Sequence, residues 1–179
     1  MNNIEVRMTE SPSDQDWYEV KRRALVTMGY TKVLTLPDEH WKHRILKSRH
    51  SPIRRLFFSF DIVCPYWVSV HLCRHLHAQP YVRSQRNDRQ SEYDRNSAPQ
   101  DALVNMIWDM NGEELMTVMN KRLCTLASEE TRYVVRLMRD QVLARYPEYT
   151  GLLVPNCVHN GGVCHEMYPC GKNGGNKDA

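Results

Sequence analysis

Residues 65–90, PYWVSVHLCRHLHAQPYVRSQRNDRQ, hold the pattern on which the fold and the candidate site depend. The apolar run after Pro65 predicts a buried helix, because a proline in the first helical turn loses no intrahelical hydrogen bond. The pattern becomes polar at Cys73. Pro80 then excludes a continuous helix and favours an extended conformation at Gln79. The stretch therefore predicts a helix followed by an extended segment.

Arginine and histidine side chains gather after this predicted helix. The helix delivers Arg74 and His75 to one point, and we expect the extended segment to bring Ser84 and Arg86 back towards that point. Guanidinium groups are permanent cations with five donors, which suits phosphate groups and planar carbonyls. The pattern predicts an anion site for a phosphorylated ligand. The alternative is a solvated arginine-rich loop that only raises solubility.

The flanking segments predict an α+β fold in which an antiparallel or mixed sheet packs against helices. Residues 56–63 alternate aromatic and polar side chains, which is typical of a strand with one buried face, and residues 101–110 form a second short apolar run. One face of the predicted helix that starts near Pro37 holds His40, Lys42, His43 and Arg44, and we expect it to be solvated. Helices are predicted over 14–28 with a cap at Ser13, from near Pro37 to about Ser48, over about 112–126, and from a cap at Ser128 to Pro147.

Composition limits the class of protein. The chain has 179 residues, of which 41% are hydrophobic, so one core domain over 1–150 is expected, followed by a Cys- and Gly-rich tail over 151–179. The net charge of +3 is low for a dedicated nucleic-acid-binding protein. The sequence has neither an apolar run long enough for a membrane span nor an apolar core near residue 1, so we expect a cytoplasmic protein without a membrane partner.

The tail contains three of the six cysteines. Cys157, Cys164 and Cys170, with His159 and His165 nearby, could bind zinc or an iron–sulfur cluster. The spacings are wider than in ordinary zinc modules, and the tail has no Cys-x-x-Cys pair. A metal is therefore not favoured, and we expect reduced thiols.

Two stretches together are similar to the signature of the flavin-dependent thymidylate synthase family. Residues 74–76, Arg-His-Leu, are followed after seven residues by 84–86, Ser-Gln-Arg, where the family carries Arg-His-Arg, about seven residues, then Ser and Arg. Asn111, Thr117 and Arg122 stand at the spacing of a second family motif. The phrases SPIR, PYWVSVH, YVRSQR and PQDA resemble a shorter branch of the family that ends in a Cys-containing tail.

This resemblance implies a function. Members convert dUMP to dTMP by reductive methylation, with methylenetetrahydrofolate as carbon donor and NADPH as reductant of FAD, in homotetramers whose sites lie between subunits. The cofactor carries the chemistry, and the protein binds and aligns the reactants. The resemblance implies catalytic roles for Ser84, Arg86 and Arg122, FAD contacts from Arg74, His75 and Asn111, and dUMP contacts from His71, Ser84, Gln85, Arg86 and Arg122, without a metal.

Three departures from the family pattern fall on ligand contacts. Arg54-Arg55 stands where the family has Glu-His, Leu76 replaces an arginine, and Val82 replaces an acidic residue. They keep open a repurposed or non-catalytic homologue that binds a pyrimidine nucleotide. The arginine cluster keeps open a small basic nucleic-acid-binding protein, whose binding would fall steeply with salt.

Overall fold

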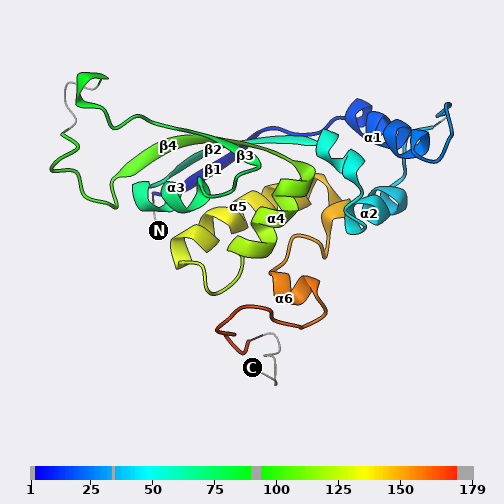
Figure 1. Ribbon diagram of the computed structural model, residues 1–179. Coiled ribbons are helices and arrows are strands. Elements are labelled where there is room, and N and C mark those ends of the chain that lie inside the picture. The colour runs from blue at the N-terminus through cyan, green and yellow to red at the C-terminus, as the bar shows by residue number, and fades with distance from the viewer. Residues whose placement is uncertain (1–2, 34, 90–93, 173–179) are drawn as a thin grey trace.

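Four antiparallel strands form the centre of the computed structural model, which describes residues 3–33, 35–89 and 94–172 (Figure 1). In chain order they are β1 (Glu5–Glu10), β2 (Phe57–Pro65), β3 (Ala78–Val82) and β4 (Leu103–Asn111), and their spatial order is β1-β2-β4-β3. β2 and β4 pair over their whole length, from Phe57 opposite Asn111 to Pro65 opposite Leu103. The predicted α+β class is confirmed, and the sheet is antiparallel throughout.

The helices follow the predicted segments, with differences at their ends. Ser13 and Ser128 cap helices as predicted. The second helix begins near Pro37, as predicted, with Asp38 as its cap, because the Asp38 carboxylate accepts from the Trp41 N–H at 2.7 Å. The helices are α1 (Asp14–Val26), α2 (Glu39–Lys47), α3 (Tyr66–Leu72), α4 (Gly112–Arg122), α5 (Glu129–Arg145) and α6 (Asn156–His159), with 3-10 turns η1 (Ser51–Arg55), η2 (Asn87–Arg89) and η3 (Pro147–Tyr149). The prediction that the α4 segment continues to 126 was wrong, because the chain turns after Leu123 before the Ser128 cap.

One face of the sheet is covered by α4 and α5 (Figure 1). Phe58 and Phe60 of β2 and Trp108 of β4 are fully buried against this layer, together with Met116 of α4 and Val135 of α5. Burying each large apolar side chain stabilises the fold by about 2 kcal/mol. The core therefore fixes the position of α4 relative to the sheet, and α4 carries part of the candidate site.

The other face of the sheet has no helix over it among the described residues (Figure 1). Across this face Tyr81 stands opposite Ile107, Ile107 opposite Asp61, and Asp61 opposite Arg7, to which it is ion-paired at 2.7 Å. The row lines a shallow pocket of about 630 Å³. Four apolar side chains of this sheet face are substantially exposed: Phe57 40%, Tyr81 57%, Leu103 41% and Ile107 45%.

The polar face of α2 is only partly the solvated surface that we predicted, because His40 and Arg44 are exposed whereas Lys42 and His43 are half-buried. Lys42 lies 3.6 Å from the carboxylate of Glu148 in η3, and the Glu148 side chain is only 3% exposed. His43 Nδ1 lies 2.9 Å from the Glu148 carbonyl oxygen. These groups pair across α2 and η3, which are distant in sequence.

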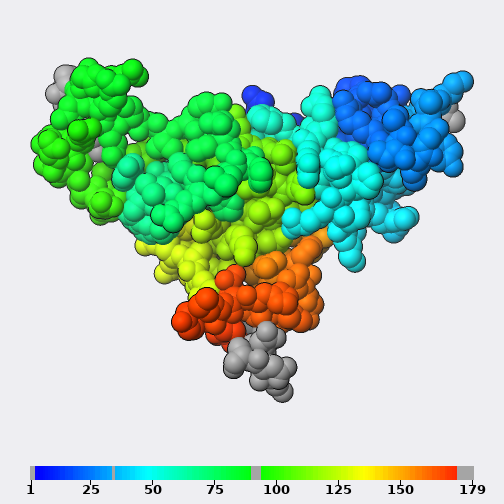
Figure 2. Space-filling view, viewed as in Figure 1, coloured from blue at the N-terminus to red at the C-terminus, as the bar shows by residue number. Residues whose placement is uncertain are grey.

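The start of the predicted tail packs on the body. Leu152 and Leu153 are buried, and the side-chain amide of Asn120 in α4 donates to the carbonyls of Leu152 at 3.3 Å and Val154 at 2.7 Å. Figure 2 shows the following segment, orange to red, beneath α4 and α5. The division into a domain over 1–150 and a tail over 151–179 stays a prediction.

Candidate functional site

A row of three side chains, two buried and one half-buried, connects the end of α3 with α4. His75, three residues after α3, places Nδ1 3.0 Å from Oε1 of Glu114 in the first turn of α4. Nε of Arg122, the last residue of α4, donates to Nε2 of His75 at 2.9 Å. His75 and Glu114 are 8% and 5% exposed, whereas Arg122 is half-buried, so the row runs from the interior towards the surface.

The row fixes the protonation of the imidazole. An arginine Nε carries a hydrogen and can only donate, so Nε2 of His75 must hold a lone pair. The ring hydrogen therefore sits on Nδ1, where it is donated to the Glu114 carboxylate. The edge of the Trp108 ring system packs against this ring, with centroids 5.8 Å apart. His75 is thus a neutral bridge between an anionic and a cationic group.

The first turn of α4 places Glu114. The Asn111 side chain caps the helix, accepting from the backbone N–H of Glu113 at 3.0 Å and of Glu114 at 2.9 Å. Gly112 begins the helix where a Cβ would lie only 3.0 Å from the Ile53 carbonyl oxygen, so any larger residue would require its neighbours to shift. The positive end of the helix dipole also favours a carboxylate there.

Positive charge collects at the other end of the row. Partial burial of the Arg122 guanidinium lowers its pKa, and the charge of Arg74 lowers it further. Nη2 of Arg122 donates to the His71 carbonyl at 3.1 Å, while Nη1 makes no hydrogen bond to the described residues. Two neighbouring guanidinium groups and a free donor pair suit an anionic or carbonyl-bearing ligand.

A pocket of about 290 Å³ lies beside the row, at the start of α4. Arg54 at its rim is paired with Glu113, so the pocket is polar but carries little net positive charge. Ligand pockets in proteins usually range from about 300 to 1,000 Å³, so this one admits a single ring system or one end of a larger ligand. Its lining residues are Arg54, His77, Asn111, Glu113, Glu114 and Thr117.

Ser84 and Arg86 lie elsewhere in the chain. β3 starts at Ala78 beside His75 and runs along β4, so that Ala78 pairs with Met110 and Val82 with Met106. At about 3.3 Å per residue, Ser84 is about 20 Å along the strand direction from Ala78. Figure 1 shows the chain after β3 projecting beyond the end of the sheet. The expectation that this segment returns to the Arg74–His75 point was wrong for a single chain.

The cause of this error is strand pairing. Pro80 does not end the extended segment, because an edge strand tolerates proline, and β3 is an edge of the sheet. Beyond β3, the Arg86 guanidinium makes two hydrogen bonds to Asp88, at 2.9 and 2.6 Å. The Ser84 hydroxyl accepts from the Arg86 backbone N–H at 3.3 Å. Ser84 and Arg86, with Gln85 between them, form a second cluster.

The other site residues predicted from the sequence lie in or near the row of Glu114, His75 and Arg122. Arg74 and His71 are exposed, and the His71 ring packs edge-on against Trp67. Both ring nitrogens of His75 are engaged within the chain, and the Asn111 side-chain oxygen is engaged by the helix cap. Sequence reasoning missed Glu114. Its only sequence signal is its place three residues after a capping asparagine.

The departures from the family pattern can also be placed. Arg55 is ion-paired with Asp16 of α1 at 3.0 Å. Leu76 is 90% exposed, and Val82 is half-buried at the end of β3. Within the described residues no three or more His, Cys, Asp or Glu side chains are grouped to hold a metal ion. Among the helices of that same part of the chain, none has the length and apolar character that a bilayer crossing needs.

Comparison with known proteins supports the expected resemblance. Residues 88–148 match the family model of the thymidylate synthase complementing protein. The UMP/dUMP methylase PolB from Streptomyces cacaoi, bound with 5-Br dUMP, is 14% identical with a TM-score of 0.65 over 85% of this chain and 97% of that chain. No curated protein matches the sequence.

Two solved structures of thymidylate synthase X from Helicobacter pylori, each with FAD and dUMP, give the same result. Both are 15% identical with a TM-score of 0.66. The alignments cover 87% and 83% of this chain and 99% and 97% of those chains. The chain therefore has the fold of the flavin-dependent thymidylate synthases, and the resemblance inferred from its sequence is confirmed.

Proposed function

We propose that this chain, which has the fold of the flavin-dependent thymidylate synthases and matches their family model over 88–148, is a flavin-dependent dUMP methylase. The product would be dTMP, with methylenetetrahydrofolate as carbon donor and NADPH as reductant. The observation that carries the proposal is the contact between the two motif stretches. His75 of the first stretch and Arg122 of the second are hydrogen-bonded although 47 residues separate them in sequence.

The residues around Arg122 suit a pyrimidine nucleotide. Arg122 and Arg74 offer charge and donors to a phosphate or to uracil carbonyls, and His71 lies beside them. The named neighbours were crystallised with dUMP or 5-Br dUMP, which supports the ligand class. The Ser84 hydroxyl accepts from the Arg86 backbone N–H. We assign Ser84 a hydrogen-bonding role at the nucleotide, because in the proposed reaction the flavin and not a protein nucleophile supplies the chemistry.

The pocket at the start of α4 fits one end of FAD. The Asn111 amide N–H₂, Arg54 and His77 provide donors for a ring edge. Glu113 and Glu114 also line the pocket and would repel the pyrophosphate, which must lie outside it. Bound FAD, once reduced by NADPH, would supply the hydride for the methylation. The chain would hold the ring and position dUMP beside it.

We propose that a complete site includes a second copy of the chain. Arg86 and Ser84 lie beyond the far end of β3, away from His75, so one copy does not gather all of the implied residues. The uncovered sheet face, with exposed Tyr81 and Ile107, offers an apolar contact surface. A homotetramer in which Ser84, Gln85 and Arg86 reach a neighbour's Arg122 accounts for both observations. A cytoplasmic location stays a prediction.

The test begins with the visible spectrum of the purified protein with FAD, before and after dUMP. We expect bound flavin whose spectrum changes with dUMP, and dTMP formed when methylenetetrahydrofolate and NADPH are added. Arg122→Gln should lose turnover, whereas Arg136→Gln on α5 serves as a matched control. A protein that neither binds FAD nor forms dTMP would refute the proposal.

A second candidate is a homologue that binds a pyrimidine nucleotide without methylating it. It is favoured by Arg55, which is ion-paired with Asp16 where the family has a flavin-contacting histidine. Calorimetric binding of dUMP without any flavin binding would support this candidate. DNA binding that weakens steeply with salt would instead support a nucleic-acid-binding protein.

A further inference from the structure

We infer that Glu114 is a positioning residue of the candidate site, acting through His75 to set the orientation of the Arg122 guanidinium. The inference rests on the proposed function for its ligand, a pyrimidine nucleotide. Its structural basis is the row in which Glu114 Oε1, the two ring nitrogens of His75 and Arg122 Nε are joined at 3.0 and 2.9 Å.

The first step is the choice of tautomer. A carboxylate has only acceptors, so Glu114 stabilises the ring form with hydrogen on Nδ1. That form leaves the lone pair on Nε2, which is the acceptor that Arg122 Nε needs. The opposite tautomer would bring two N–H groups together at Nε2 and break the contact with Arg122.

The second step is the effect on Arg122. Its Nε is held by His75 and its Nη2 by the His71 carbonyl, so the plane of the guanidinium is set by two hydrogen bonds. Nη1 keeps two N–H groups that no described residue accepts. A planar cation held at two nitrogens presents the third in one direction, which reduces the ordering cost of ligand binding.

The third step is burial. Glu114 is 5% exposed and His75 8%, so the contact between them is shielded from solvent, while the contact of His75 with Arg122 is partly buried. The titratable groups that face His75 are Glu114 and Arg122, and Arg74 is the charged group next to Arg122. The negative charge of Glu114 sits behind the neutral ring rather than on the guanidinium. Arg122 therefore contacts the neutral His75 ring and not the Glu114 carboxylate, so its positive charge remains available to a ligand.

Three variants separate this role from a merely structural one. Glu114→Gln keeps the shape, but its amide can donate as well as accept and no longer enforces the tautomer. His75→Gln places an oxygen acceptor near the position of Nε2, whereas His75→Asn replaces only Nδ1. Glu129→Gln, an exposed carboxylate in the first turn of α5, is the matched control.

Two measurements on the full chain are needed, after thermal unfolding has verified that each variant folds. Nitrogen-15 NMR of the His75 ring, without ligand, should report hydrogen on Nδ1 and none on Nε2 in the wild type. Calorimetry with dUMP should show a loss of about tenfold or more for Glu114→Gln and His75→Asn, a smaller loss for His75→Gln, and near wild-type affinity for Glu129→Gln.

The outcomes distinguish this inference from the proposed function. A wild-type protein that does not bind dUMP contradicts the proposed function. The nitrogen-15 spectrum of the His75 ring then remains as the test of whether Glu114 determines the tautomer of that ring. Hydrogen on Nε2 in the wild type overturns the inference. Equal dUMP affinity in wild type, Glu114→Gln and His75→Asn also overturns it, while leaving the proposed function intact.

Discussion

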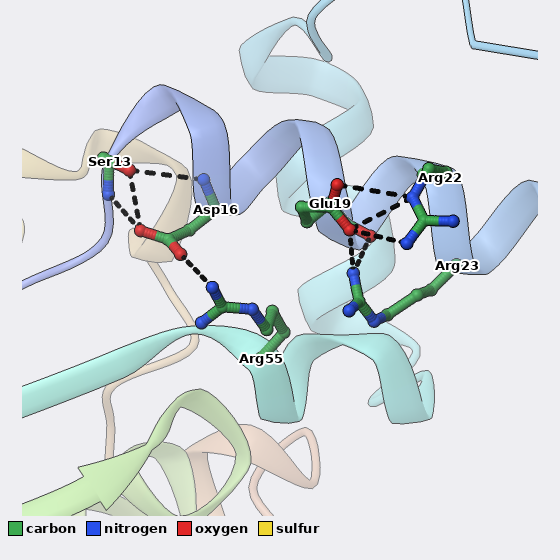
Figure 3. Close-up of polar contacts among 6 residues, drawn as sticks. All are labelled: Ser13, Asp16, Glu19, Arg22, Arg23 and Arg55. Atoms are coloured by element: carbon green, nitrogen blue, oxygen red, sulfur yellow. Dashed lines mark hydrogen bonds and ion pairs between the residues drawn. The ribbon is translucent and has the colours of Figure 1, made fainter.

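Arg55 at the end of η1 is ion-paired with Asp16 in the first turn of α1, with 3.0 Å between Nη2 and Oδ1 (Figure 3). The other carboxylate oxygen of Asp16 accepts from the backbone N–H of Ser13 at 2.9 Å and from its hydroxyl at 2.7 Å. One carboxylate thus completes the cap of α1 and ties that helix to η1. Arg54, the neighbouring residue of η1, lines the candidate pocket, so α1 supports one wall of it.

The Asp16 contacts predict a pH-dependent contribution to stability. Burial acts to raise the pKa of Asp16, but the hydrogen bonds from Ser13 and the charge of Arg55 outweigh it and bring the pKa below its usual 3.8. A carboxyl with a lowered pKa stabilises the fold above its unfolded value, and this contribution is lost as the pH falls through the lowered pKa. We expect Asp16→Asn to lose about 1 kcal/mol of unfolding free energy at neutral pH.

Urea unfolding at neutral pH and again below pH 3.8 tests this prediction. The difference between Asp16→Asn and wild type should shrink at the lower pH, because the native carboxyl is then increasingly protonated. Asp14→Asn, an exposed acidic residue of the same turn, is the control. A difference that is equal at both pH values would contradict the assigned cause.

We expect the contributions of Lys42 and Glu148 to the unfolding free energy to be coupled. The ion pair spans 3.6 Å, the Glu148 side chain is 3% exposed, and Lys42 Nζ lies 5.0 Å from the Trp17 ring centroid. Lys42→Met leaves a buried carboxylate without its cation and should cost about 3 kcal/mol. The double variant Lys42→Met/Glu148→Leu should regain most of this loss. Chemical denaturation of the double-mutant cycle measures the coupling, and additive losses would show that the two groups act independently.

Close packing around Gly112 limits the size of the residue at the start of α4. A Cβ there would lie 3.0 Å from the Ile53 carbonyl oxygen, 3.1 Å from the Tyr149 hydroxyl and 3.2 Å from the Leu56 Cβ. Gly112→Ala should therefore cost about 2 kcal/mol of unfolding free energy, since these neighbours must move.

The control for Gly112→Ala is Gly161→Ala. Gly161 has a φ of +66° but no atom within 4 Å of an added Cβ, so it tests backbone strain without a clash. Strain at such a position should cost about 1 kcal/mol. Chemical denaturation that ranks Gly161→Ala as the more destabilising change would contradict the packing argument.

We expect copies of the chain to associate through the uncovered sheet face around Ile107. It is 45% exposed in the middle of the uncovered sheet face, where a glutamate would oppose any apolar contact. Ile107→Glu should convert an oligomer to smaller species in light scattering coupled to gel filtration. Val158→Glu on α6, at a matched exposure of 44%, should leave the mass unchanged. A wild-type protein that is monomeric at assay concentration would contradict self-association.

We expect two inactive variants, one altered at Arg86 and one at Arg122, to complement each other when their chains assemble together. If one site takes Arg86 from one copy and Arg122 from another, Arg86→Gln and Arg122→Gln should each be inactive alone. After unfolding and refolding together, random pairing of the two inactive chains should restore about a quarter of the sites. The dTMP-forming rate measures this recovery. Hybrids verified by native mass spectrometry that remain inactive would assign both residues to the same copy.

The sequence by itself determined most elements of secondary structure. The alternation over 56–63, the caps at Ser13 and Ser128 and the helix after Pro65 depend on neighbours within a few residues, so local patterns suffice. The motif spacing also identified Arg122 and His75, and the structure joins them. Local signals carry this information because hydrogen bonding within one helix or one cap involves adjacent residues.

Tertiary structure decided what these residues contact. The strand order β1-β2-β4-β3 sends β3 away from His75 and separates Arg86 from it, although the sequence pattern favoured their convergence. The sequence pattern predicts a solvated Lys42 and does not single out Glu114, yet both residues have partners that are distant in the chain. Pairing of strands and burial of charge depend on which segments meet in space. The sequence pattern around a single residue does not contain that information.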